Sequence, residues 1–489
     1  MPKLALKIGL PVVIGALVVV VLISRGAADS VLSFEWQTSE RLLLSAADAN
    51  GASKVTVSPR GTHVAYVLKE NQGNTEKHVL NLDGRKVGVY DYVWEIIFSP
   101  DGKRNAFRLD QGPNSGDNEF YIVDGKEQQK YSLLDMDSAA FSPDGSLFGY
   151  PVHSRDQQNF IVMNGIPGKS YEMIWGIGQH NEAPLAFSPN GRHYGYQARQ
   201  NEKSLLVIDG KEHLVQWNLD KLPVFSGDGT RWGWVNLIRT ELPGGKMRLE
   251  NQVLIDGEPY GKIYPEIANN PDFSPDGKRI AFGANTTRRE GPPLPDGGGL
   301  IVVDGKELEP RYEWVRTIVF SPDNKRLAYE AKRRGKFVVV LDGEESKEYD
   351  LVFPNSLVFS PDSRRLAYRV SKDKVEYLVV DGVEQGPYIR VRTPPVFSPD
   401  SRHVVYLAAS EKEEFAVIDG AARSTYEETS VPDSGTDAFR SAMAVHISPE
   451  PIQFLTRDSF GYVAKRGGAY YWIEERRVRH LAPQKAKPK

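Results

Sequence analysis

Phe98-Ser99-Pro100-Asp101 is the clearest copy of a four-residue phrase that returns along this chain. The other copies begin at Phe141, Phe187, Phe273, Phe320, Phe359 and Phe397, and weaker ones begin at Val57 and Phe225. A repeat of about 40 residues is the signature of a fold assembled from copies of one small unit. The phrase therefore determines the architecture, and chemistry has to be sought in what does not repeat.

Each unit shows the pattern of β-strands around this phrase. An aromatic residue follows nine positions after its first residue, as Tyr329 follows Phe320, and a small residue such as Ala328 precedes that aromatic in all units but the last. Large and small residues alternate and neither side is polar, so we expect this strand to lie between neighbouring sheets. A second apolar run ends in Asp-Gly or Asn-Gly, as at Asp304-Gly305, which favours a tight hairpin turn. A short fourth run, often with Tyr, completes a unit of four strands.

Radial sheets of four strands at this spacing predict an all-β fold, the β-propeller. Nine units are clear, and a tenth, degenerate unit fits the sequence from Phe460 to Ile473. We expect the propeller over residues 51–475, a linker or first closing segment over 25–50 and a basic flexible tail over 476–489. The repeats leave two arrangements open, one large ring or two smaller rings in tandem.

These phrases resemble the TolB-like, WD-repeat-like propeller family, over about Val55 to Glu475. That family includes the propeller of the translocation protein TolB and those that cap prolyl-oligopeptidase-type peptidases. The resemblance implies the fold. It does not extend to the translocation or peptidase role, because we find neither an α/β domain before the repeats nor a hydrolase domain after them.

Composition and motifs argue against several classes of function. The 489 residues carry a net charge of −3, whereas a nucleic-acid binder needs a basic face. The chain has no cysteine, which excludes disulfides and thiolate sites. None of the nine histidines is paired at metal-ligand spacing, and no Gly-x-Ser-x-Gly motif occurs. We therefore expect no catalytic, metal or cofactor residues, and a protein that is not an enzyme.

The N-terminus predicts export of the repeats. Lys3 and Lys7 lie in residues 1–7, before an apolar run over 8–24. This run predicts a transmembrane anchor or uncleaved signal that leaves residues 1–7 in the cytoplasm. We expect a bacterial inner-membrane protein with its propeller in the periplasm. The alternative is release into the periplasm after cleavage near Ala28.

Insertions identify one face of the expected ring as functional. They follow the second or fourth strand of a unit, and such connections emerge on the face opposite the Ser-Pro-Asp turns. We call that side the insertion face and the other the turn face. Loops that grow on a rigid scaffold are where binding usually resides. The inserted segments are 69–77, 110–118, 239–251, 285–299 and 422–450.

Arginine and tryptophan are the usual anchors of an interface, and both types are expected on the insertion face. The candidate partner-binding residues are Arg239, Lys246, Arg248, Arg288, Arg289, Trp94, Trp175, Trp217 and Trp314. The tryptophans are expected late in fourth strands or just after them. The function we expect is a scaffold that docks a protein partner, in a membrane or periplasmic complex. The alternative is an enzyme or small-ligand site at the central mouth of the same face.

Overall fold

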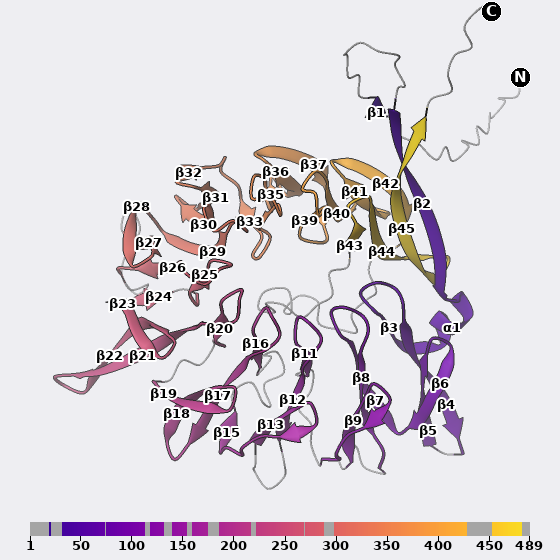
Figure 1. Ribbon diagram of the computed structural model, residues 1–489, viewed down its shortest axis with the longest axis horizontal. Helices are drawn as coiled ribbons and strands as arrows, with labels where there is room; N and C mark the ends of the chain where they lie inside the picture. Colours follow the sequence, from indigo (N-terminus) through magenta and orange to yellow (C-terminus); the bar gives the residue numbers. More distant parts are fainter. Residues whose placement is uncertain are drawn as a thin grey trace, which may run out of the picture.

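The computed structural model describes residues 19–20, 32–73, 75–112, 118–131, 139–153, 159–174, 185–216, 222–267, 269–287, 298–427 and 452–481. These residues form an all-β propeller of ten blades, arranged as one ring (Figure 1). Each blade is a meander of antiparallel strands, because tight turns join consecutive strands of the repeat.

The first five blades follow the chain in order. Blade 1 contains β3 (Ala52–Val57), β4 (Val64–Gln72), β5 (Thr75–Leu82) and β6 (Arg85–Tyr90), after α1 (Ala46–Gly51). Blade 2 contains β7 (Tyr92–Phe98), β8 (Asn105–Asp110), β9 (Glu119–Val123) and β10 (Lys126–Glu127). Blade 3 contains β11 (Ala140–Phe141), β12 (Phe148–His153), β13 (Asn159–Met163) and β14 (Ile166–Pro167). Blade 4 contains β15 (Met173–Ile174), β16 (Ala186–Phe187), β17 (Tyr194–Gln200), β18 (Lys203–Ile208) and β19 (Lys211–Val215). Blade 5 contains β20 (Val224–Phe225), β21 (Trp232–Leu242), β22 (Lys246–Ile255) and β23 (Glu258–Tyr264).

The remaining blades return to the N-terminal strands. Blade 6 contains β24 (Glu266–Ile267), β25 (Asp272–Phe273), β26 (Ile280–Asn285), β27 (Gly299–Val303) and β28 (Lys306–Tyr312). Blade 7 contains β29 (Trp314–Phe320), β30 (Leu327–Arg333), β31 (Lys336–Leu341) and β32 (Glu344–Glu345). Blade 8 contains β33 (Leu351–Val352), β34 (Val358–Phe359), β35 (Leu366–Lys372), β36 (Val375–Val380) and β37 (Val383–Tyr388). Blade 9 contains β38 (Arg390–Val391), β39 (Val396–Phe397), β40 (Val404–Ala409), β41 (Glu414–Ile418) and β42 (Ala421–Tyr426). Blade 10 contains β43 (Ile452–Thr456), β44 (Ser459–Arg466), β45 (Ala469–Leu481), β2 (Leu32–Leu44) and β1 (Val19–Val20).

Buried apolar clusters decide between one ring and two. Ten clusters join each blade to the next one along the chain. The closing cluster packs Leu44 and Tyr470 of blade 10 against Val57 and Tyr66 of blade 1. Two tandem rings would require a blade in the middle of the chain to close on blade 1, whereas among the described residues blade 1 packs against blades 2 and 10, so the alternative of two smaller rings is wrong.

Blade 10 is built from both ends of the chain. β2 pairs antiparallel with β45, from Leu32 opposite Leu481 to Leu44 opposite Tyr470. The segment expected over 25–50 as a linker or first closing segment thus includes strand β2, which pairs with the last strand of the chain, and most of α1. The basic tail was expected to begin at 476, but β45 continues to Leu481 because β2 offers its backbone as a partner over that length.

The expected membrane anchor over 8–24 lies outside the described residues, except for Val19 and Val20. These two residues form β1, which pairs with Phe34 and Ser33 of β2. In the part of the chain that the structure describes, no helix is long and apolar enough to cross a membrane.

The small residues of the second strands lie where the next blade packs. A Cβ atom placed on Gly149 would lie 2.5 Å from Leu185, and one on Gly233 would lie 2.6 Å from Pro271. Each contact comes from the first strand of the following blade, or from just before it. The expectation that this strand lies between neighbouring sheets is confirmed, and close approach is why the position is small.

Tyrosines at the ends of two blades form hydrogen bonds and ring contacts with the next blade. Tyr349 ends blade 7, donates a hydrogen bond to Glu384 of blade 8 at 3.2 Å, and meets the ring of Tyr368 edge-on at 6.4 Å. Tyr312 of blade 6 makes the same pair of contacts with Glu345 and Tyr329 of blade 7. The tyrosine expected in the fourth run of each unit thus stabilises the contact with the next blade.

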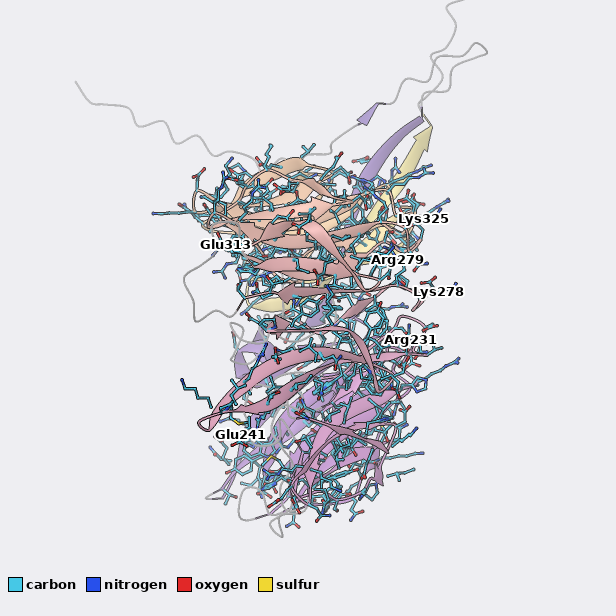
Figure 2. The ribbon with its side chains drawn as sticks, turned by 90° about the vertical axis from the view of Figure 1, so that its left-hand side faces the viewer. Arg231, Glu241, Lys278, Arg279, Glu313 and Lys325 are labelled. Carbon is cyan, nitrogen blue, oxygen red and sulfur yellow. The ribbon has the colours of Figure 1, made fainter. Side chains whose placement is uncertain are left out.

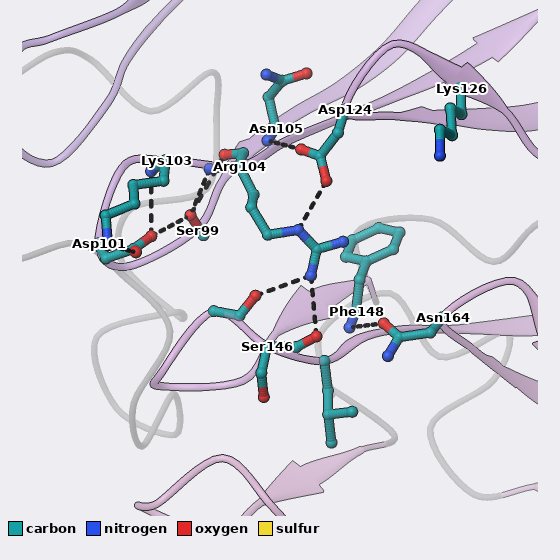
Figure 3. Close-up of polar contacts among 12 residues, drawn as sticks. Ser99, Asp101, Lys103, Arg104, Asn105, Asp124, Lys126, Ser146, Phe148 and Asn164 are labelled. Carbon is teal, nitrogen blue, oxygen red and sulfur yellow. Dashed lines mark hydrogen bonds and ion pairs between the residues drawn. The ribbon is translucent and has the colours of Figure 1, made fainter.

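On the turn face, an arginine clasp joins both turns of a blade to the next blade (Figure 3). Arg104 donates from Nε to Asp124 in the second turn at 2.7 Å. Its Nη1 donates to the carbonyls of Gly145 and Ser146 in blade 3, at 2.9 and 3.0 Å. The contact with Asp124 confirms that the Ser-Pro-Asp turns and the Asp-Gly hairpins share one face.

Candidate interaction surface

The two faces of the ring carry different structures (Figure 2). Arg231, Arg279 and Lys325 extend from one face, whereas Glu241 lies at the tip of a hairpin on the other. The first three belong to the repeated turns, and Glu241 belongs to the insertion of blade 5. The repeated turns therefore lie on one face, and the insertion of blade 5 lies on the other.

The insertion of blade 5 is a β-hairpin and not the loop that was expected over 239–251. β21 and β22 pair without interruption from Gly233 opposite Ile255 to Leu242 opposite Lys246. Gly244 and Gly245 turn the chain with φ of 86° and 72°, values that glycine adopts without strain. Inserted residues that pair with one another satisfy their own backbone groups, so the insertion extends the strands instead of forming a loop.

The tip of this hairpin presents apolar side chains to solvent. Leu242, Met247 and Leu249 are 38%, 52% and 43% exposed. Residues opposite each other on paired strands share a side, so Met247 lies beside Glu241, and Leu242 beside Lys246, on the two sides of the ribbon. Every residue from 239 to 249 is exposed. The tip is therefore an amphipathic ridge, and we call residues 239–249 the blade-5 ridge.

Three predicted residues belong to the blade-5 ridge. Arg239 and Lys246 are exposed, and Arg248 pairs with Glu250 at 2.6 Å while its side chain stays 52% exposed. The apolar members were missed by the sequence reasoning, which weighed charge and tryptophan. Leu242, Met247 and Leu249 stand within an insertion of mostly polar residues, and that contrast was the available signal.

The hairpin of blade 1 provides a comparison within the chain. β4 and β5 also extend beyond the common strand length, and they pair as far as Gln72 opposite Thr75. Their extension carries only polar residues, and Lys69 pairs with Glu76 at 2.9 Å. This hairpin is a solvated extension, so exposed apolar residues are a property of blade 5 and not of hairpin insertions in general.

Two of the predicted tryptophans pack against neighbouring aromatic rings. They lie near the starts of first strands, Trp94 in β7 and Trp314 in β29, whereas they were expected late in fourth strands or in the connections after them. Trp94 stacks on Tyr92 with centroids 5.0 Å apart, and Trp314 meets Phe337 edge-on at 5.3 Å. Both are partly buried by such packing. The first strands of blades 2 and 7 are long. They begin within the segments that the sequence predicted as connections from the preceding blades.

The other predicted anchors, Arg288, Arg289, Trp175 and Trp217, lie outside the described residues. The same holds for most of the insertion over 285–299. The patch expected from blades 5 and 6 together is therefore represented by the blade-5 ridge.

Three histidines of the described residues lie at the repeated turns. His63, His193 and His403 hold the place of the clasp arginine in blades 1, 4 and 9, each with Nδ1 2.6–2.7 Å from an Asp carboxylate. Across the described ranges, no group of three or more His, Asp or Glu side chains is arranged to hold a metal ion. The recurrent Asp residues are thus turn-forming groups.

Asp272 is the exception among the inner strands, and it gives a testable pH dependence. Burial raises the pKa of its carboxyl to about 8, whereas an unfolded Asp titrates near 4. The folded state therefore binds a proton that the unfolded state releases, and stability falls as the pH rises from about 4 to about 8. We expect Asp272→Asn to be more stable than the parent at pH 9, by roughly 1 kcal/mol or more in the free energy of unfolding and therefore with a higher melting temperature, and to melt at the same temperature as the parent at pH 4. Equal melting temperatures at both pH values would contradict this.

Comparisons with known proteins do not show a family for this chain. No protein-family model matches it. Alanine–tRNA ligases of Listeria welshimeri and Listeria innocua are 23% and 24% identical to it over 245 residues, which is 45% of this chain. The chain matches 25% of the length of these curated relatives.

Solved structures with similarity to the chain include several propellers. The β-propeller domain of the Trilobed protease from Pyrococcus furiosus is 14% identical, with 76% of this chain and 95% of that one covered and a TM-score of 0.31. TolB from Acinetobacter baumannii is 12% identical, with 74% and 78% covered and a TM-score of 0.24. The Dos1 propeller is 9% identical, with 78% and 91% covered and a TM-score of 0.34. With TM-scores of this size the likenesses decide nothing about the fold, and the assignment to TolB-like repeats is not shown.

Proposed function

We propose that this protein is a docking scaffold that binds a protein partner through the blade-5 ridge. The observation that carries the proposal is the exposure of Leu242, Met247 and Leu249 at the tip of a hairpin whose other residues are mostly polar. Exposed apolar residues rimmed by charge mark surfaces that become buried on association. Arg239, Lys246 and Arg248 supply the polar rim that interfaces carry around their apolar centre.

A regular ring suits this role. Blades joined by continuous apolar clusters form a rigid base, so a projecting hairpin keeps its shape while it binds. The proposal includes the location expected from residues 1–24, at the inner membrane with the ring outside. The partner would then be a membrane or periplasmic protein.

Site-specific photo-crosslinking tests the proposal. A photoreactive amino acid is placed at Met247 in cells, and the same amino acid is placed at Gln72 in the blade-1 hairpin as the matched control. We expect a discrete crosslinked protein from position 247 and none from position 72. The protein would be identified by mass spectrometry and its binding measured with purified components.

The variant Leu242→Ser/Met247→Ser then removes two of the three exposed apolar side chains of the ridge. Both side chains are exposed, so the melting temperature should stay within about 1 °C of the parent. Affinity for the crosslinked protein should fall at least tenfold, because interface anchors each contribute more than about 1 kcal/mol. Unchanged affinity, or equal crosslinking from both hairpins, would refute the docking role of the ridge.

A further inference from the structure

The turn face contains a site where the repeated clasp is missing. In five blades an arginine links its own blade to the next, and its guanidinium lies over the ring of the Phe that opens the following phrase. The distances from guanidinium carbon to ring centroid are 5.0 Å for Arg104, 5.8 Å for Arg231, 5.1 Å for Arg279, 5.8 Å for Arg326 and 5.3 Å for Arg365. A planar guanidinium group therefore occupies the equivalent position between consecutive blades in five places.

Blade 3 has neither partner of this clasp. Leu147 stands where the arginine would be, and Asn164 stands in place of the aspartate. The Oδ1 atom of Asn164 accepts from the backbone N–H of Phe148 at 2.8 Å, as Asp124 accepts from Asn105 in blade 2. That contact fixes the amide, so its Nδ2 takes the position of the second carboxylate oxygen. The site presents a donor where its sister sites present a negative acceptor.

A groove lies open at this place. The groove between blades 3 and 4 has a volume of about 360 Å³, and Asn164, Tyr194 and Gly210 are among its lining residues. The corresponding groove between blades 2 and 3 is lined by Asp124, Phe148 and Gly165 and has about 230 Å³. Arg104 is among the residues that line the smaller groove, and no arginine lines the larger one. The groove is thus larger where the arginine is absent.

The walls of the open groove are aromatic and electrically neutral. Tyr194 and Tyr196 lie nearly parallel, at 8° with centroids 6.5 Å apart, and Tyr171 meets Tyr196 edge-on. The one cation, Lys169, is paired with Glu212 at 2.6 Å. Burial, with the neighbouring Glu212, raises the pKa of Tyr171 to about 12, so its hydroxyl stays protonated. These walls favour a flat, uncharged group over an ion.

We propose that this groove binds a neutral planar aromatic ring that carries a hydrogen-bond acceptor. The ring lies against Tyr194 and Tyr196, and the acceptor receives the hydrogen bond from Nδ2 of Asn164. Its source is a free small molecule or an aromatic side chain of a peptide, since both offer the same chemistry. The site lies between the repeated turns of blades 3 and 4 and is separate from the blade-5 ridge.

Ligand-detected NMR tests the proposal with benzamide as the probe. Cyclohexanecarboxamide keeps the amide and loses the flat ring, so we expect it to bind about tenfold more weakly. A capped Gly-Tyr-Gly peptide, whose phenol oxygen can accept the hydrogen bond, tests the second source, because binding by the peptide alone would assign the site to a side chain. Absence of saturable binding by both benzamide and the peptide would overturn the proposal.

The variant Leu147→Arg/Asn164→Asp rebuilds the clasp of the sister blades and fills the groove. We expect binding of the probe to fall at least tenfold while the melting temperature is kept or raised. Should the double variant fail to fold, Tyr194→Ala removes part of the wall and is expected to weaken binding in the same direction. Binding unchanged in the folded variant would place the ligand elsewhere and refute the site.

Discussion

Replacing Arg423 by methionine is expected to lower the free energy of unfolding by about 3–5 kcal/mol, which is the cost of leaving a buried charge unpaired. Arg423, in β42, donates to Glu475 of β45 from Nε at 3.2 Å and from Nη2 at 3.0 Å. Nη2 also donates to the carbonyl of Trp36 in β2. Glu475 is fully buried, and Thr38 of β2 is the other side chain that donates to it, at 2.9 Å. The arginine therefore ties blade 9 to both terminal strands that close the ring.

Chemical denaturation, followed by tryptophan fluorescence and by far-UV circular dichroism, measures this effect. The double variant Arg423→Met/Glu475→Leu removes both charges and should recover most of the lost stability, since a buried pair replaced by apolar residues is often neutral. Arg466→Met is the matched control. Arg466 of β44 pairs with Glu40 of β2 within blade 10, beside this junction, but is 52% exposed, so its loss should cost under about 1 kcal/mol. A double variant as unstable as the single one would show that packing, and not charge, explains the loss.

Gly61→Ala is expected to destabilise the ring by about 3 kcal/mol, through backbone strain and steric overlap together. Gly61 has a φ of 60°, and a Cβ atom there would lie 2.2 Å from the indole ring of Trp472. Trp472 belongs to β45, so this contact lies at the junction of blades 10 and 1. The rigid indole has no free space to enter, because it also lies against Gly461.

The repeat supplies the control for this substitution. Gly102 holds the same turn position in blade 2 with a φ of 71°, but a Cβ atom there would meet its nearest neighbours at 3.6 Å. Gly102→Ala should therefore cost only about 1 kcal/mol, the strain of a left-handed backbone. In a Trp472→Ala background the difference between the two alanine variants should largely disappear, because the overlap is gone. If the two variants were equally unstable in the parent, the contact with Trp472 would have no measurable cost.

Local sequence predicted the blade well because its determinants lie close together in the chain. The Ser-Pro-Asp turn closes within five residues, where Ser99 Oγ donates to Asp101 at 2.7 Å and the N–H of Gly102 to the carbonyl of Ser99 at 2.8 Å. The left-handed φ of 50° at Asp304 is likewise a property of the Asp-Gly pair. Strand order and the two faces follow from these turns.

The interaction surface was predicted only in part. Arg239, Lys246 and Arg248 lie on the exposed ridge, but Trp94 and Trp314 are half-buried against neighbouring aromatic rings. The sequence around a tryptophan between two blades does not show whether the residue lies in an exposed connection or in the first strand of the next blade. The difference is made by pairing partners such as β8 and β30, which lengthen β7 and β29.

By itself, the sequence determined that this protein is an array of four-stranded units and which units grew insertions, since turns and spacings are local. Tertiary structure alone decided that ten units make one ring, because β2 and β45 stand at opposite ends of the chain and their pairing leaves no short-range signal. It also decided that the blade-5 insertion is an ordered hairpin with exposed apolar residues, and that the missing arginine at Leu147 accompanies an open groove. Burial and empty space depend on neighbours that only folding brings together.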